Sequence, residues 1–527
     1  MTALPRMDEE SRHLLERLVR LDTTNLEDPV HGRVEKRHYQ EACELLVDEA
    51  KRHGLAARIW DPRKELPGGA SRFGEPRPNV VIDLNRGKPR RLLILSHYDV
   101  VPVPDEQLGR WKSPPHTLTE REDGRLYGRG SNDDIGSGVV TGMAALRALA
   151  AVKDLPVDVR MVVCCDEETG GAGGIEAVAE HDLALPEGSP ERLLLGEMAV
   201  LPDGSPYVAA GSSGVTFTEI SVPPRSTLSQ YLRVAQGTIE FRTVAESWTS
   251  ALRSPPEPSG PAPHEFITGR ATVTKIDAVG DGPAAPKGAL LTRVHANSEA
   301  ANQIPATVTL TFRGEAGSLG HLEKFLRGHM ASPFRLEPTP AKEGWTVNVI
   351  GKSGHGGYPH RASNPVPEVV RLLTLAVREG IVQDHPLRDA VLTLDLRSPP
   401  EMEAANAFGI FEGHFRSLQT DVAGASAVVP PGRARSGYFL SPQDPEATRI
   451  QGIFQEVAGR PIGIYGEYGG TDASSLREIR TPSGRPMPAV VLGSMDEDAH
   501  MHDAEESIDP RYFREVVDLL VRWVRTA

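Results

Sequence analysis

The chain has 527 residues, 39% of them hydrophobic and 25% charged, which is an ordinary balance for a globular protein. Its formal net charge of −14 argues against nucleic acid and anionic membrane surfaces as partners. No apolar run approaches the roughly 18 residues of a membrane span, and the first residues lack the pattern of a signal peptide. Three cysteines make no disulfide framework, so we expect a reducing, cytoplasmic location.

Apolar residues recur at helical spacing in some stretches and form short continuous runs in others. The stretches with helical spacing are residues 9–21, 34–53 and 139–149. The continuous runs, typical of strands covered on both faces, are residues 79–84, 92–95, 157–165 and 193–195. Strands that alternate with helices predict an α/β fold with a mostly parallel sheet, in which sites form at the carboxyl ends of the strands.

A histidine and an aspartate follow the run 92–95. His97 and Asp99 are two residues apart, and in an extended segment residues at this spacing point the same way. The pair suits a metal ligand and the acceptor that orients its other ring nitrogen. A lone histidine at a strand end is more often satisfied by an ordinary neighbour, so the pair alone does not define a site.

Carboxylates gather after the other runs. The glycine-rich stretch 126–138, LYGRGSNDDIGSG, presents Asp133 and Asp134 on a turn. The acids Asp-Glu-Glu at 166–168 follow the run 157–165, and Glu197 follows the run 193–195. Acids at the end of an apolar strand are costly to bring together unless cations offset their repulsion. A solvated acidic turn is the alternative interpretation of each cluster.

The pattern changes after residue 206. Alternating runs between proline-rich and glycine-rich joints predict an inserted α+β domain at 212–436. The expected division is therefore 1–211 for the first part of a catalytic domain, 212–436 for the insertion and 437–527 for the second part. The last part carries His500 and His502 in the stretch DEDAHMHDAEE.

The candidate ligands form one set. They are His97, Asp133, Glu168, Glu197 and His502. Imidazole and carboxylate without thiolate suit zinc, cobalt or manganese rather than a structural zinc finger. A set of this size favours two divalent ions about 3.5–4 Å apart, with one shared carboxylate, over a single ion. Glu167, next to a ligand but pointing elsewhere, is the expected general base for an attacking water.

The chain resembles the co-catalytic zinc exopeptidase and deacylase family, which includes glutamate carboxypeptidase, aminoacylase, acetylornithine deacetylase and the bacterial and carnosine-type dipeptidases. The motifs that carry the resemblance are SHYDVVP at 96–102, GRGSNDDIG at 128–136, DEETG at 166–170, LGE at 195–197, GKSGHGGYPHRASNP at 351–365, DLR at 395–397, GGTDA at 469–473 and HDAEESI at 502–508. Any one of them would be weak, but their shared order is specific.

The resemblance implies a fold and a set of roles. The fold is a mostly parallel sheet flanked by helices, with an inserted α+β lid domain. The implied metal ligands are His97, Glu168 or Glu197 as terminal ligands, Asp133 as the bridging carboxylate and His502 on the second ion. Asp99 would be the partner of His97 and Glu167 the base, and the peptide bond after Asp133 would be cis.

Three residues of the insertion also acquire roles from the resemblance. His355 would stabilise the tetrahedral oxyanion, and Arg397 would bind the α-carboxylate of the substrate with its guanidinium fork. Asn302 would be a further substrate contact. The order of these motifs and the length of the lid look like those of bacterial dipeptidases with a doubled lid, which favours a monomer over a homodimer.

Some positions depart from the family pattern. Ile135 stands where lysine is usual, Glu505 where Asn or Asp is common, and Met198 where proline or a small residue is frequent. None of them removes a ligand, but they leave the substrate open. The spacing to the residues at 506–508 selects His502 over His500 as the last ligand.

The expected substrate is a dipeptide with a free α-carboxylate. An N-acyl-amino-acid deacylase or a carboxypeptidase would use the same residues and is the alternative. A non-catalytic binding or scaffold protein is disfavoured by the intact ligand set and by Glu167. A phosphate-binding protein is disfavoured because the GRG loop at 128–130 lacks the rest of a phosphate-binding motif.

Overall fold

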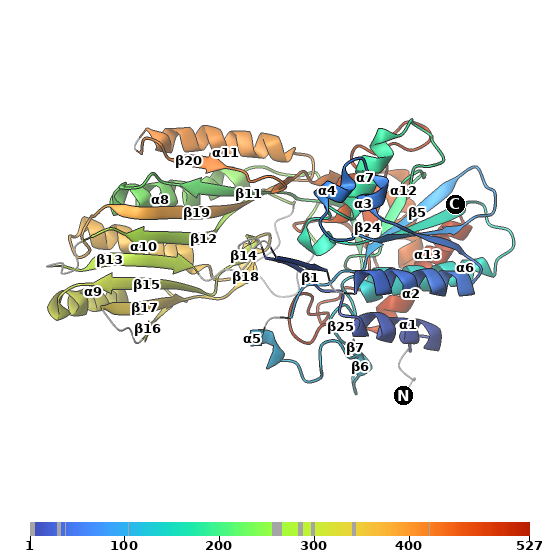
Figure 1. The fold of residues 1–527 in the computed structure, drawn as a ribbon, viewed down its shortest axis with the longest axis horizontal. Coiled ribbons are helices and arrows are strands. Elements are labelled where there is room, and N and C mark those ends of the chain that lie inside the picture. Colours follow the sequence, from blue (N-terminus) through green and yellow to red (C-terminus); the bar gives the residue numbers. More distant parts are fainter. Residues whose placement is uncertain are drawn as a thin grey trace. The chain divides into compact units, whose positions relative to one another are not determined.

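The computed structural model describes residues 6–28, 33–36, 38–103, 105–255, 266–282, 288–296, 301–339, 344–420 and 422–527. The chain forms two compact units. The first comprises Met1–Gly211, Tyr438–Tyr465 and Thr471–Ala527, and the second comprises Ser212–Gly437 and Gly466–Gly470 (Figure 1). The insertion expected at 212–436 and the second unit cover nearly the same residues, apart from the short return at Gly466–Gly470.

The first unit is built around a mixed sheet. Its strands, in spatial order, are β22 (Tyr438–Phe439), β10 (Val208–Ser212), β24 (Ala489–Val491), β9 (Ala199–Leu201), β5 (Arg91–His97), β8 (Asp158–Cys164), β4 (Asn79–Leu84) and β3 (Ala56–Trp60), with β23 (Ile464–Glu467) beside β10. The central strands β24, β9, β5 and β8 run parallel. The flanking strands β10, β4 and β3 pair antiparallel, so only the centre of the sheet follows the predicted parallel arrangement.

Helices cover both faces of this sheet. Alternate residues point to opposite faces of a strand: Leu92 and Ile94 of β5 pack in one core, and Leu93 and Leu95 in another. The helices on the first face are α1 (Glu9–Arg20), α2 (Tyr39–Arg52), α6 (Thr141–Ala150), α12 (Pro445–Ala458) and α13 (Pro510–Arg525). Those on the second are α7 (Ile175–Ala184) and the 3₁₀ helix η4 (Asp472–Leu476), near the short helices α3 (Pro62–Glu65) and α4 (Gly69–Arg72).

Several short elements of this unit lie outside the main sheet. They are β1 (Asn25–Asp28), β2 (Arg33–Lys36), α5 (Asp105–Leu108), β6 (Thr119–Glu120), β7 (Leu126–Tyr127), the π-helical turn η1 (Ile135–Val140), the 3₁₀ turn η2 (Glu167–Thr169) and β25 (Ser507–Ile508). Strand β25 pairs with β7. This pairing joins the glycine-rich loop that follows β7 to the segment near the end of the chain.

One predicted strand is wrong. Residues 193–195 lie outside any strand, and the strand of this region is β9, Ala199–Leu201. The reason is local, because the backbone N–H groups of Leu193 and Leu194 donate to the buried carboxylate of Asp182, at 2.7 and 2.6 Å. They are therefore satisfied without a neighbouring strand.

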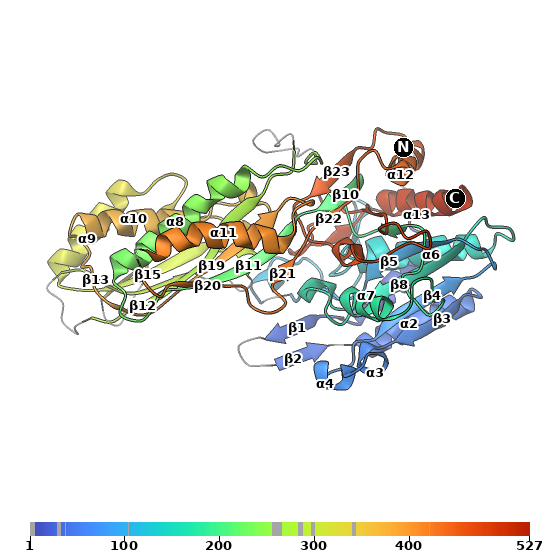
Figure 2. The same ribbon diagram turned by 90° about the horizontal axis from the view of Figure 1, so that it is seen from above.

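The second unit is an antiparallel sheet with helices on one face (Figure 2). Its strands, in spatial order, are β16 (Arg335–Thr339), β17 (Trp345–Ile350), β15 (Thr307–Arg313), β13 (Leu290–Ala296), β12 (Arg270–Gly280), β19 (Leu387–Ser398), β11 (Gly214–Ser221) and β20 (Ser426–Val428), with β21 (Ala434–Arg435) beside β11. The helices are α8 (Leu228–Glu246), α9 (Ala316–His329), α10 (Pro365–Arg378) and α11 (Ala404–Gln419), with a short 3₁₀ turn η3 (Pro359–Arg361).

The core of the second unit leaves two polar residues on the other face of β19. Leu394 and Leu396 point into the core that the helices cover, so Asp395 and Arg397 point to the opposite face. A separate ladder of two short strands, β14 (Gln303–Ile304) and β18 (Gly354–His355), contains His355 at the end of β18. Among the helices of the described residues, none has the length and hydropathy needed to span a membrane.

Candidate metal centre

The parallel strands of the first unit bring several polar residues to one edge of the sheet. His97 is the last residue of β5, η2 with Glu167 and Glu168 follows β8, and Asp203 lies two residues beyond the end of β9. Because these strands are parallel, their carboxyl ends meet at the same edge.

His97 is the centre of the first group of candidate ligands. Its Nε2 atom lies 3.3 Å from Oδ1 of Asp133 and 3.9 Å from Oδ1 of Asp203. Its Nδ1 atom lies 3.1 Å from the carbonyl oxygen of Asp99 and 3.4 Å from its Oδ1 atom. Asp99 therefore fixes the ring, and Nε2 faces the carboxylates.

His502 is the centre of the second group. Its Nε2 atom lies 3.0 Å from Oδ2 of Asp133 and 3.1 Å from Oε2 of Glu168. Within each group the candidate ligand atoms all lie within 4.8 Å of one another. Asp133 belongs to both groups and offers one oxygen to each, which is the arrangement of a carboxylate that bridges two cations.

The electrostatics of the groups fit bound cations. Burial raises the pKa of Asp203 and of Glu168. Burial alone would lower the pKa of His97 and of His502, but the neighbouring carboxylates raise both well above the ordinary value of histidine. Oε1 of Glu168 is buried and has no hydrogen-bond partner among the described residues. A site with this much buried negative charge and an unused acceptor oxygen suits divalent metal ions.

Asp99 also holds the acidic turn η2 in place. The carboxylate of Asp99 accepts hydrogen bonds from the backbone N–H groups of Glu167 and Glu168, at 3.1 and 3.2 Å. One aspartate therefore orients both the ring of His97 and the turn that carries the expected base.

The glycine-rich loop is shaped by Asp134. Its buried Oδ2 atom accepts a hydrogen bond from the backbone N–H of His97 at 3.1 Å. A Cβ atom at Gly138 would lie 2.0 Å from that oxygen, so only glycine fits there. The peptide bond between Asp133 and Asp134 is cis.

Glu197 does not join either group, and its prediction as a ligand has to be corrected. Its backbone N–H donates to the carbonyl oxygen of Arg91, the first residue of β5. His97 is the last residue of that strand, so Glu197 lies at the opposite end of the sheet. The error follows from the misplaced strand at 193–195, because the acid after the true strand β9 is Asp203. The apolar run before Asp203 was the signal that could have identified it.

Of the two histidines near the end of the chain, His502 rather than His500 lies in a candidate ligand group. His502 contacts both Asp133 and Glu168, whereas His500 is exposed and belongs to neither ligand group. Both residues have positive φ angles, 51° for His500 and 60° for His502.

The predicted substrate residues of the second unit lie near one another. The backbone N–H of Gly356 donates to the carbonyl oxygen of Asn302 at 2.7 Å, and His355 pairs with Gln303 across the β14–β18 ladder. A Cβ atom at Gly356 would lie 2.1 Å from Oδ2 of Asp395.

Asp395 in turn holds the guanidinium of Arg397. Nε and Nη2 of Arg397 donate to the two oxygens of Asp395 at 2.7 and 3.1 Å, and both residues are buried. Asn302, the His355 turn and Arg397 thus form one neighbourhood within this unit.

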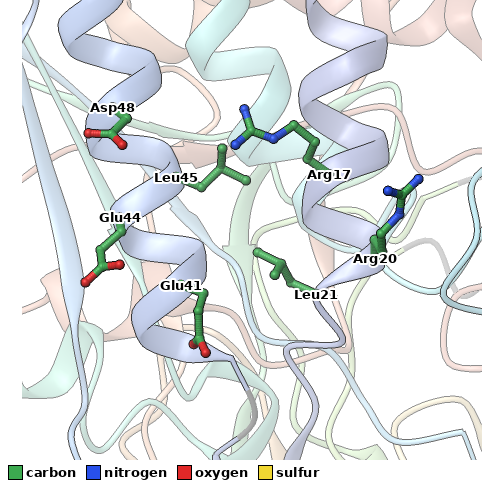
Figure 3. A pocket seen from close by; sticks show the side chains of 7 residues that line it. All are labelled: Arg17, Arg20, Leu21, Glu41, Glu44, Leu45 and Asp48. Atoms are coloured by element: carbon green, nitrogen blue, oxygen red, sulfur yellow. The ribbon is translucent and has the colours of Figure 1, made fainter.

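A shallow groove between α1 and α2 is a separate feature of the first unit (Figure 3). It has a volume of about 360 Å³. Its lining residues are Arg17, Arg20, Leu21, Glu41, Glu44, Leu45 and Asp48. None of them belongs to either ligand group.

Known proteins share this fold. Human carnosine dipeptidase 1 matches with a TM-score of 0.54 and 15% identity, over 98% of this chain and 95% of that one. The dipeptidase Dug1p of Saccharomyces cerevisiae gives a TM-score of 0.57 and 11% identity, over 98% and 95%. The metallo-carboxypeptidase Sso-CP2 of Sulfolobus solfataricus gives 0.57 and 13%, over 98% and 99%. At these identities the likeness concerns the fold alone.

Curated sequences match parts of the chain. A succinyl-diaminopimelate desuccinylase of Acidovorax ebreus is 28% identical over 272 residues, which are 51% of this chain and 59% of that protein. An uncharacterized metallohydrolase of Methanococcus maripaludis is 38% identical over 109 residues, 20% of this chain and 25% of that protein. In five such relatives, including these two, the part that matches this chain is between 25% and 59% of the relative's length.

The fold and the imidazole–carboxylate cluster together define a metal-dependent hydrolase. The sequence model of peptidase family M20/M25/M40 matches residues 93–526, which include every candidate ligand. The chain belongs to this peptidase family, and the resemblance drawn from the sequence motifs is confirmed.

Proposed function

We propose that the chain is a two-metal peptidase that hydrolyses the amide bond of dipeptides with a free α-carboxylate. The observation that carries the proposal is the pair of ligand groups that share Asp133. His97, Asp133 and Asp203 would hold one ion, and Asp133, Glu168 and His502 the other. Zinc is the favoured metal, with cobalt or manganese as alternatives, because the donors are imidazole and carboxylate without thiolate.

Metal ions bound there would supply Lewis acidity for the scissile carbonyl and acidify a water molecule. Glu167 would take the proton of the attacking water and return it to the leaving amine. Asp99 supports this role because its carboxylate holds the backbone of Glu167 and the ring of His97. Water attack assisted by a fixed carboxylate is the chemistry that this arrangement favours.

The second unit would supply the substrate contacts. We propose that Arg397 binds the α-carboxylate, that His355 stabilises the oxyanion and that Asn302 is a further contact. Asp395 supports the role of Arg397, because it fixes the guanidinium through two hydrogen bonds and leaves its remaining N–H donors for an anion.

An N-acyl-amino-acid deacylase is the second candidate function. The match to a succinyl-diaminopimelate desuccinylase favours it, since that protein shares 28% identity over 272 residues with this chain. A carboxypeptidase would use the same residues.

We also propose that the protein is cytoplasmic and monomeric. Cys43, Cys164 and Cys165 are free and buried, which supports a reducing compartment.

The test is a substrate panel. Metal-stripped protein is assayed with dipeptides and with N-acetyl and N-succinyl amino acids, before and after addition of Zn²⁺, Co²⁺ or Mn²⁺. Metal-dependent cleavage of free dipeptides is the expected result. Cleavage of acylated amino acids alone would move the protein to the deacylases, and cleavage of neither class by the metal-loaded protein would contradict the proposal.

A further inference from the structure

The two ligands Asp133 and His502 come from segments far apart in the chain, and Glu506 lies where these segments meet. Its Oε1 atom accepts hydrogen bonds from the backbone N–H groups of Asn132 and Asp133, both at 3.1 Å. Glu506 is itself four residues beyond His502. One carboxylate therefore connects the backbone of the shared ligand to the loop of the other.

The second oxygen of Glu506 is also engaged. Nη1 of Arg129 donates to Oε2, and the side chains of both residues are 1% exposed. The backbone carbonyl of Glu506 accepts further hydrogen bonds from the N–H of Gly128, at 3.0 Å, and from the hydroxyl of Ser131, at 3.3 Å. All these donors belong to the glycine-rich loop at 126–138, which also carries Asp133.

The loop that carries His502 has a conformation that needs such support. His500, His502 and Glu505 have φ angles of 51°, 60° and 70°, a region that residues other than glycine rarely adopt. Two arginines that precede the glycine-rich loop in the sequence form ion pairs with acids near His502: Arg110 pairs with Asp503, and Arg121 pairs with Glu505.

We propose that Glu506 is a positioning residue that couples Asp133 to His502 and so sets the geometry of the shared metal site. The inference rests on the proposed two-metal site and names a residue outside the ligand set. Partners that orient metal ligands without touching the metal typically change metal affinity by about 10–100-fold when they are replaced. We expect an effect of this size from Glu506.

The matched control is Asp496. Its carboxylate pairs with Nη1 and Nη2 of Arg125, both at 2.7 Å, and Arg125 also donates to Ser507 at 2.8 Å. This largely buried ion pair joins the same two segments as Glu506 and Arg129. Arg125 also donates to the backbone oxygen of Ser507 at 3.1 Å, but the carboxylate of Asp496 pairs with Arg125 and does not bind the backbone of Asp133, as the carboxylate of Glu506 does. We therefore expect this pair to contribute to stability without positioning a ligand.

The experiment compares Glu506→Gln with Asp496→Asn. Both replace a carboxylate by an amide, but the glutamine must turn its NH₂ group towards a donor, either Arg129 or the backbone N–H groups. Zn²⁺ is titrated into metal-stripped protein by calorimetry, and Co²⁺ absorption reports the ligand geometry. Glu506→Gln is expected to weaken one of the two sites by about 10–100-fold and to alter the Co²⁺ spectrum. Asp496→Asn is expected to lower the Tm while both affinities stay at the wild-type values.

Two results would overturn the inference. One is a Glu506→Gln protein that binds two ions as tightly as the wild type, and the other is an equal loss of affinity in Asp496→Asn. If Glu506→Gln does not fold, the double variant Arg129→Met/Glu506→Gln removes both buried charges and is measured in the same way. Wild-type protein that binds fewer than two ions would instead contradict the proposed function.

Discussion

Asp99 shows how much of this site depends on single residues. Its carboxylate accepts the N–H groups of Glu167 and Glu168 and lies 3.4 Å from Nδ1 of His97. The proposed base and two candidate ligands are therefore held by one side chain, which itself belongs to neither ligand group of the described residues.

The role of Glu167 predicts a specific kinetic defect. Glu167→Gln keeps the size of the side chain but removes the base, so kcat should fall by about 10²–10⁴-fold. The protein should still bind its metal ions, because Glu167 belongs to neither ligand group. Steady-state kinetics together with metal analysis checks both statements. Turnover at the wild-type rate would contradict the assignment of the base.

The assignment of Asp203, rather than Glu197, as a metal ligand predicts that alanine variants at these two positions differ in metal affinity. Asp203→Ala removes an oxygen that faces His97, 3.9 Å away, so the affinity for one ion should fall. Glu197→Ala changes a residue at the other end of the sheet and should leave metal binding unchanged. Competition with a chelator measures both affinities. Loss of metal in Glu197→Ala with full binding in Asp203→Ala would restore the original assignment.

At the scale of elements, local patterns predicted much of the fold. The run 79–84 is strand β4, the run 92–95 lies within β5, and the stretch 9–21 corresponds to α1. The direction of β4 and β10 in the sheet was not predictable, because strand pairing depends on distant segments. The strand at 193–195 was predicted wrongly because the carboxylate of Asp182, which lies 11 and 12 residues before Leu193 and Leu194, binds their backbone.

The same distinction holds for the site. His97, Asp133, Glu168 and His502 could be found because each lies in a local motif, and the structure brings them together. Arg129 and Glu506 could not be predicted as partners, since residues 377 positions apart meet only in the folded chain. Asp203 was missed because its position depends on where β9 ends.

The first helix allows a test of stability against pH. Asp8 caps α1 by accepting a hydrogen bond from the N–H of Ser11 at 3.0 Å, and Arg147 lies beside it. Burial alone would raise the pKa of Asp8, but the bonds from Ser11 and the charge of Arg147 outweigh it and lower the pKa. The Asp8→Ala protein should lose about 1 kcal/mol of unfolding free energy at pH 7.

The pH dependence of that loss follows from the sign of the shift. A lowered pKa in the folded state means that the ionised group stabilises the protein above the ordinary aspartate value of about 3.9. The contribution is lost as the pH falls through the lower, folded value. Urea unfolding should therefore be measured at pH 7 and near pH 3 for the wild type and for Asp8→Ala. The difference in unfolding free energy between the two proteins should be smaller near pH 3 than at pH 7. A difference that widens in acid would contradict this account of the cap.

At the scale of the whole molecule, the first unit has a hydrophobic core on each face of its sheet, the second unit has one core, and each unit has its own share of the predicted chemistry. The candidate ligands and Glu167 belong to the first unit, and Asn302, His355 and Arg397 belong to the second. The family match covers residues from both units. We infer that the first unit determines metal binding and that substitutions such as Arg397→Ala change the handling of substrate without changing metal content.

The shared two-metal site is tested most directly by anomalous diffraction from zinc-loaded crystals at the zinc absorption edge. We expect two peaks about 3.5–4 Å apart, one contacted by His97 and Asp203, the other by Glu168 and His502, with Asp133 between them. A single peak, or a peak coordinated by Glu197, would contradict the shared two-metal site.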